Sequence, residues 1–171
     1  MAIMIWAGIG IFFSTAFGES PDWINLSLSP TRLVKGVGEL HTEFPLLSSV
    51  SLLGITAYGR TPSTWNIDLG IQGRYYGIGD GQSGGFIASE LRYANILYRN
   101  EADQFDAFFI RPAALIGGKF QTDIGLTLEA AVGIDYNQSI VSSQGQQDAI
   151  RTGNWNRIFR LNVGWFIERN P

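Results

Sequence analysis

Hydrophobic and polar residues alternate along much of the chain. The pattern is clearest in residues 66–76, where Ile67, Leu69 and Ile71 are interleaved with Asp68 and other polar or small residues. Residues 124–136 repeat it, with mostly Ile, Leu and Val on one face and Gly, Thr, Glu and Asp on the other. A period of two predicts β-strands with one apolar and one polar face. Segment 124–136 is longer than most strands, and its length suits a tilted membrane crossing.

Eight such segments follow one another, and together they predict an all-β fold: an eight-stranded, antiparallel, up-and-down transmembrane β-barrel. In two of them, 50–59 and 105–116, both faces carry apolar residues. An even number of strands places both termini on one side of the membrane, expected to be the periplasm. The predicted strands are 23–29, 37–44, 50–59, 66–76, 86–98, 105–116, 124–136 and 156–167. The predicted periplasmic turns are 45–49, 77–85 and 117–123, and the extracellular loops are 33–36, 60–64, 99–104 and 137–154.

Composition supports one β-rich domain and excludes several chemistries. The 171 residues include 21 glycines and 13% aromatic residues, and only 16% are charged; this balance favours strands and turns. The net charge of -3 and the scattered arginines provide no basic stripe, so no nucleic-acid partner is expected. Without cysteine, and with His41 as the single histidine, disulfides and zinc-thiolate or multi-histidine metal sites are excluded, and no cofactor is expected. The two lysines, Lys35 and Lys119, both fall in predicted turns, whereas soluble surfaces usually carry more lysine.

The first 18 residues form an apolar, uncharged segment. It ends in small residues, Ala16 and Gly18, before the acidic Glu19. This ending is typical of a secretory signal peptide, although a basic residue near the start is missing. We therefore expect a signal peptide at 1–18 and an outer-membrane barrel at 19–171, with an uncleaved anchor as the alternative.

Aromatic residues cluster near the ends of the predicted strands. Such rings favour the headgroup level of a bilayer, so two rims of them are expected in a membrane barrel. One predicted rim holds Trp23, Phe44, Tyr75, Tyr76, Phe86 and Trp165, and the other holds Tyr58, Trp65, Tyr98, Tyr136 and Trp155.

Short motifs in three predicted strands resemble those of a known group. Residues 74–76 (Arg-Tyr-Tyr) precede a glycine-rich turn, Gly85 and Phe86 open the next strand, and residues 161–166 (Leu-Asn-Val-Gly-Trp-Phe) close the chain's pattern. The chain resembles the small eight-stranded outer-membrane barrels of Gram-negative bacteria, a group that includes the transmembrane domain of outer-membrane protein A. Within that group it is most similar to a family of uncharacterised barrels. The resemblance implies a bacterial outer-membrane location and outer-membrane lipid as a partner.

If the apolar face meets lipid, the polar face fills the barrel interior. Eight strands leave an interior just wide enough for side chains to fill, and buried charges must pair there. We expect a plug of ion pairs; a pathway for ions, in which pairs exchange partners, is the alternative. The predicted network consists of Glu39, His41, Glu43, Asp68, Arg74, Glu90, Arg92, Arg111, Glu129, Asp135 and Arg160.

Catalysis is not expected. His41 lies between two glutamates on one strand face, but the histidine, any residue, serine pattern of lipid A deacylases is absent, because Thr42 and Glu43 follow it. The glycine-rich run 77–81 lacks a following helix and the calcium-loop spacing, and it is predicted to be a turn. The loop at 137–154 is the candidate for binding a protein or surface partner.

Three functions are therefore compatible with the sequence. The first is a structural or surface-exposed outer-membrane barrel, with an interior closed by ion pairs and binding through its loops. The second is a narrow, porin-like channel. The third is an exported barrel of lipocalin type, in which the apolar face would turn inward around an apolar ligand.

Overall fold

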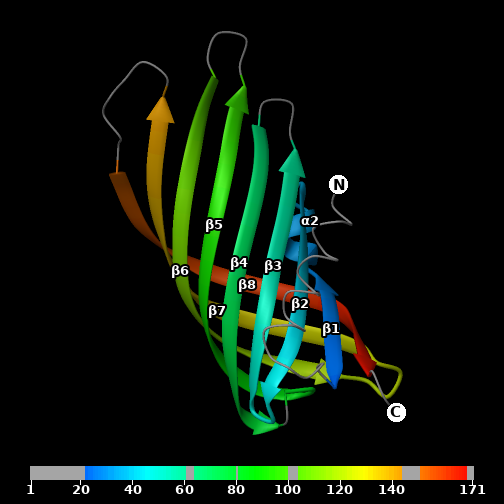
Figure 1. Cartoon of the computed structure of the whole chain (residues 1–171). Helices are drawn as coiled ribbons and strands as arrows, with labels where there is room; N and C mark the ends of the chain where they lie inside the picture. Colours follow the sequence, from blue (N-terminus) through cyan, green and yellow to red (C-terminus); the bar gives the residue numbers. More distant parts are fainter. Residues whose placement is uncertain (1–21, 61–63, 80, 100–103, 144–150, 169–171) are drawn as a thin grey trace.

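The protein is an eight-stranded antiparallel β-barrel in the computed structural model (Figure 1), which describes residues 22–60, 64–79, 81–99, 104–143 and 151–168. Each strand pairs with its neighbours in the sequence, and β8 pairs with β1 to close the barrel. The predicted all-β fold and eight antiparallel strands are thus confirmed. The strands are β1 (Trp23–Leu28), β2 (Val37–Leu47), β3 (Val50–Arg60), β4 (Thr64–Gly79), β5 (Gly84–Arg99), β6 (Gln104–Gln121), β7 (Leu126–Ser143) and β8 (Arg151–Glu168).

The two ends of the barrel differ. β1 begins and β8 finishes at the same end, where Trp23 pairs with Glu168; we call this the terminal end. At the opposite, distal end lies the short helix α2 (Pro30–Leu33), which follows β1 and was not predicted. In Figure 1, β4, β5 and β6 rise well beyond α2, so the wall is taller on that side of the barrel.

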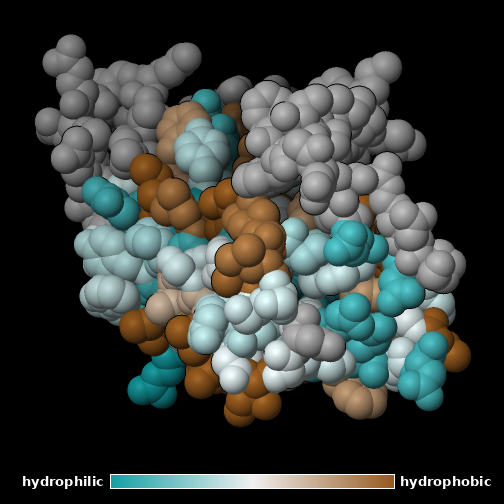
Figure 2. Space-filling view, turned by 60° about the horizontal axis from the view of Figure 1, so that its bottom comes forward, coloured by the Kyte–Doolittle hydropathy of each residue, from teal (hydrophilic) through white to brown (hydrophobic). Residues whose placement is uncertain are grey.

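The two faces of each strand have opposite character. On β4, Ile67, Leu69 and Ile71 are exposed on the outside, whereas Asp68, Gln72 and Arg74 on the opposite face point inward and are buried. β7 and β8 show the same division, with Leu128 and Val132 outside β7. The predicted alternation is confirmed, and the structure adds its direction: apolar outward, polar inward. The face seen in Figure 2 accordingly carries hydrophobic patches at its surface, beside hydrophilic ones.

The apolar core is small and lies inside the barrel toward the terminal end. Tyr76, Phe86, Ala88, Leu115 and Ala131 pack together there. On β3, inward-facing Leu53 and Ile55 are also buried. These contacts explain why segments 50–59 and 105–116 are apolar on both faces: one face packs inside and the other lies on the outer wall.

Most strands are longer than predicted, which shortens the turns, although β1 ends at Leu28, one residue earlier than predicted. β2 includes Pro45 to Leu47, β6 extends to Gln121, and β7 begins at Leu126 rather than at residue 124. Predicted loop 137–154 is mostly strand, because β7 runs to Ser143 and β8 starts at Arg151; residues 144–150 lie outside the described residues. The placement of Lys119 in a turn was wrong, since it lies on β6 and is buried. The predicted leader, 1–18, lies outside the described residues.

Glycine allows the sharp turn between β4 and β5. Gly79 and Gly84 have φ values of 92° and 149°, and a Cβ on either would lie 1.9 Å from a backbone oxygen across the turn. Only glycine fits so close an approach. The run 77–81 was predicted to be a turn, and this is only partly correct: residues 77–79 are the last residues of β4, Gly81 lies in the turn, and residue 80 lies outside the described residues.

The aromatic rims are only partly as predicted. At the distal end, Tyr58 packs against Trp65 and Tyr136 against Trp155, on outward-facing positions. At the terminal end, Tyr75 and Trp165 are exposed, but the four other predicted members of that rim are buried. Trp23, Tyr76 and Phe86 occupy inward positions of their strands, whereas Phe44 is buried on the opposite face of β2 from Glu43; the side chain of Tyr98 lies outside the described residues. No helix in the described ranges is long and apolar enough to cross a membrane.

Candidate functional site: the charged interior

The polar interior is built by period-two spacing along the strands. Glu39, His41 and Glu43 are successive inward positions of β2, so they lie at three heights in the barrel. All three are buried. Each meets partners that come from other strands at the same height, and the interior is best described level by level from the terminal end.

The terminal level contains a compact ion-pair cluster. Arg74 binds Glu129 through two hydrogen bonds, of 2.7 and 2.9 Å, and donates a third bond of 3.2 Å to Glu43. Lys119 donates to the same Glu43 oxygen at 2.8 Å, and Tyr76 donates to its other oxygen at 2.6 Å. Two carboxylates thus share two cations within a buried space, which is the arrangement that buried charges require.

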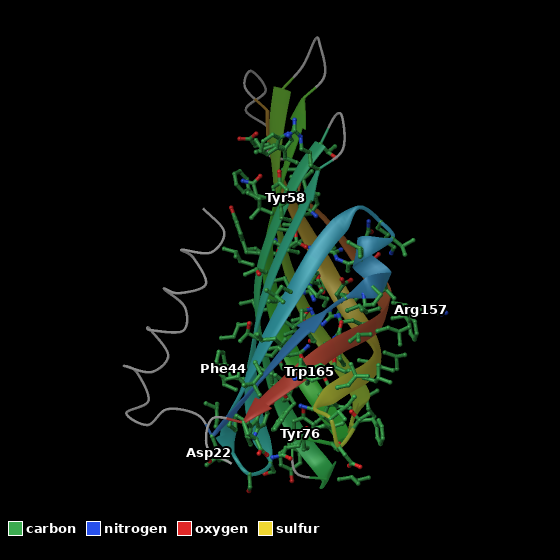
Figure 3. The ribbon with its side chains drawn as sticks, turned by 90° about the vertical axis from the view of Figure 1, so that its right-hand side faces the viewer. Asp22, Phe44, Tyr58, Tyr76, Arg157 and Trp165 are labelled. Carbon is green, nitrogen blue, oxygen red and sulfur yellow. The ribbon has the colours of Figure 1, made fainter. Side chains whose placement is uncertain are left out.

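Aromatic rings enclose this level. The Arg74 guanidinium lies over the Phe86 ring, with 4.5 Å between its Cζ and the ring centroid. Lys119 Nζ lies 5.0 Å from the centroid of Trp23 and 5.2 Å from that of Tyr76. Ring faces attract cations, so these contacts add to the ion pairs. Figure 3 shows Tyr76 near the lower end of the barrel.

The middle level links the charge clusters through neutral amides. Gln72 donates to Glu90 at 2.7 Å and accepts a bond from Arg74 Nε. Asn162 Nδ2 contacts Glu129 at 2.8 Å and His41 Nδ1 at 3.2 Å. Because the amide nitrogen can only donate, His41 accepts at Nδ1 and donates from Nε2 to Glu39, at 2.7 Å. This pattern corresponds to the neutral imidazole.

The distal level holds two more carboxylates and their arginines. Arg92 binds Glu39 through bonds of 2.6 and 3.2 Å and also donates to Glu90 from Nε. Arg160 binds Glu90 through two bonds of 2.7 and 3.1 Å. These pairs are bidentate, the geometry that best fits a guanidinium to a carboxylate. Arg92 therefore joins two strands' carboxylates across the barrel.

Nearer the distal end the network becomes less buried. Asp68 is buried and binds Arg32 of α2 and half-buried Arg111, the latter at 2.8 Å. Arg32 also donates to Glu39, at 3.1 Å. Asp135 is half-buried and accepts a bond of 2.9 Å from Asn156, with no cation bound to it among the described residues.

Most of the sequence-predicted residues come together. Nine of the eleven lie buried in one connected set of hydrogen bonds, Arg111 joins it through Asp68, and Asp135 lies apart from it. The sequence analysis missed Arg32 and Lys119. Lys119 continues the odd-numbered inward positions of β6, so extending that strand would have found it, whereas Arg32 reaches the interior from a helix with no alternation to follow.

The arrangement limits the chemistry that this interior can perform. Both ring nitrogens of His41 are engaged, and its ring is fully buried, so it is not poised to activate a nucleophile or a water. The described residues contain no group of three His, Cys, Asp or Glu that could hold a metal ion. The interior is instead suited to hold charges in fixed pairs and to occupy the space between the strands.

Comparison with protein-family models, with curated proteins and with solved structures gives no match for this chain. The fold and the charged interior are therefore interpreted from their own geometry.

Proposed function

We propose that the chain is a structural or surface-exposed β-barrel of the bacterial outer membrane, with an interior closed by ion pairs. The observation that carries the proposal is the direction of the strand faces. Large apolar side chains lie on the outer wall of most strands, while five carboxylates and their cations fill the inside. A soluble protein places these two classes the other way round.

The outer wall is too apolar for a surface in water. Ile71 on β4 is 46% exposed, Ile116 on β6 is 60% exposed and Phe159 on β8 is 61% exposed. Soluble monomers rarely expose contiguous apolar patches larger than a few hundred Å². Lipid is the solvent that matches this wall, and a sheet closed on itself, as β8 is closed onto β1 here, is one of the two kinds of structure that span lipid.

Fractionation combined with gel mobility tests the proposal. The expressed protein is expected in the outer-membrane fraction, extractable only with detergent, and its folded form should migrate differently from the boiled form. Recovery as a detergent-free monomer from the periplasm or cytosol would contradict it. A mature chain that begins near residue 19 would support the predicted signal peptide.

The narrow channel is the second candidate, and the same purified protein tests it. The bidentate pairs of Arg92 and Arg160 cross the interior at the level of Glu90, so we expect no steady conductance in planar bilayers. Reproducible single-channel steps would instead favour the channel. The lipocalin-like alternative requires an interior lined by Ile and Leu, and it fits poorly with interior positions such as Asp68 and Gln72.

Binding through the distal loops remains part of the proposal. The predicted binding loop, 137–154, is reduced to the connection between β7 and β8. This connection consists of residues 144–150, which lie outside the described residues. Trp155, at the start of β8, is 70% exposed and packs against Tyr136. These two rings lie on outward positions of paired residues of β7 and β8 and are proposed as part of the surface that a partner protein would contact.

A further inference from the structure

The barrel wall is incomplete on one side of its distal half. β1 has six residues and β8 has eighteen, so β1 pairs only with the last part of β8, from Val163 to Glu168. Residues 151–162 of β8 pair with β7 on one side; within the described ranges, no strand pairs with them on the other. Helix α2 lies in this place, and Ser29 Oγ just before it donates to the Leu161 carbonyl.

A polar cavity lies behind this gap. Its volume is about 190 Å³, and it is lined by α2 and the turn after it together with residues of five strands, β2, β5, β6, β7 and β8; most of these residues point inward, whereas Arg157 and Phe159 of β8 are exposed. Figure 3 shows Arg157 of β8 just below α2, on the same side of the molecule. At roughly 30 Å³ for each water in the liquid, the cavity has space for a small polar group and a few waters.

The cavity carries an excess of positive charge. Six of the chain's twelve basic residues line it, against three acidic ones: Arg32, Lys35, Arg92, Arg111, Arg157 and Arg160, with Glu39, Glu90 and Asp135. Asp68, directly behind, binds Arg32 and Arg111. Counting Asp68, the basic residues still outnumber the acidic ones by two. Arg157 and Lys35 make no ion pair within the described part of the chain.

One arginine that lines the cavity keeps an unused donor. Arg111 uses Nη2 for Asp68, while its buried Nε has no hydrogen-bond partner among the described residues. A guanidinium presents five N–H donors and binds phosphate through two at once. In a partly enclosed site, an oxyanion with a charge near two would compensate the excess of positive charge.

We propose that this cavity binds a phosphate group, entering from the distal mouth or sideways through the gap between α2 and β8. A free phosphate or phosphomonoester would use the mouth. A lipid with a phosphate headgroup would use the gap, with its acyl chains against the apolar outer wall beside Phe159. Only this second source rests on the proposed membrane location.

Binding to the purified full-length protein tests the proposal, in an uncharged detergent. The probes are inorganic phosphate, measured by calorimetry, and short-chain phosphatidic acid, measured by native mass spectrometry against diacylglycerol of the same chain length. The test variant is Lys35→Gln combined with Arg157→Gln, which removes cavity charge without breaking an interior ion pair. The matched control is Arg60→Gln, since Arg60 lies at the same end over Trp65 and outside the cavity.

We expect saturable binding that weakens by roughly tenfold or more in the double variant and is unchanged in Arg60→Gln. Binding of both probes supports a general phosphate site, and binding of phosphatidic acid alone identifies the lipid as the source. The absence of saturable binding to either probe, or equal binding by wild type and double variant, would overturn the proposal. Binding of inorganic phosphate can be measured equally well if the protein proves soluble. Failure of the phosphate-site proposal can therefore be distinguished from failure of the membrane proposal.

Discussion

At the scale of single residues, Arg74 is the most connected group in the interior. It donates to Glu129, Glu43 and Gln72 and lies over the Phe86 ring. Both carboxylates are buried. Removing the guanidinium would leave Glu129 with an amide as its remaining partner, from Asn162.

Replacing Arg74 with methionine is expected to destabilise the barrel strongly. Breaking a buried ion pair from one side costs about 3–5 kcal/mol, because an uncompensated charge remains buried. The measurement is the free energy of unfolding in urea, in detergent or lipid, followed by tryptophan fluorescence.

A double variant provides the control for this residue. Arg74→Met with Glu129→Met removes both partners, and part of the lost stability should return, since apolar replacement of a whole pair is often tolerated. Additive losses from the two substitutions would contradict the pairing described for Arg74 and Glu129.

At the scale of elements, the seam between β1 and β8 is where the barrel closes, and it is short. Six residue pairs hold it, from Trp23–Glu168 to Leu28–Val163. Gly164 is the residue on which this seam depends. A Cβ at that position would lie 2.5 Å from both Leu26 O and Ser27 Cβ.

We predict that Gly164→Ala weakens closure of the barrel. Overpacking of this kind typically costs about 1–3 kcal/mol. The matched control is Gly73→Ala on β4, where a Cβ meets nothing within 4 Å; it should leave stability unchanged or raise it slightly. The midpoint temperature of the folded-to-unfolded gel shift is the measurement, and equal midpoints for the two variants would contradict a tight seam at Gly164.

At the scale of the whole molecule, the distribution of polarity is that of a soluble protein turned inside out. Charged side chains are paired and buried within the barrel, while Ile, Leu, Val and aromatic residues cover the outer wall. Stability then depends on the solvent outside. In lipid, the wall is in a matching medium; in water, the same wall would be exposed to unfavourable hydration.

A charged residue introduced on the outer wall would distinguish a lipid environment from water. Ile71→Arg places an arginine on the middle of the outer wall of β4, and in lipid it should cost about 2–4 kcal/mol at the bilayer midplane. Ile78→Arg, at the terminal end of the same strand and 78% exposed, should cost about 0–1 kcal/mol. Unfolding in lipid vesicles measures both. Similar, near-zero costs for both variants would mean that water surrounds the wall.

The alternation of residues was sufficient to predict eight strands and the two faces of each, because a strand's side chains point to opposite sides whatever surrounds it. It also placed Glu39, Arg74 and Glu90 on one polar face. Strand ends were less predictable: Lys119 and residues 137–143 continue strands that the apolar pattern no longer marks. Only pairing with a neighbouring strand shows that these positions extend the sheet.

The tertiary structure determined the features that the residue pattern of a single strand cannot specify. Closure of the sheet decides that the polar faces point inward. A single strand has two faces but no interior, and an interior exists only once the strands form a closed barrel. It also sets the partners, such as Arg74 with Glu129 or Arg160 with Glu90, which lie far apart in the sequence. The short β1 leaves the distal part of β8 without a paired strand on its β1 side among the described residues, and Arg32 of α2 enters there. Period-two alternation determines which residues share a face, whereas strand register determines which of them meet.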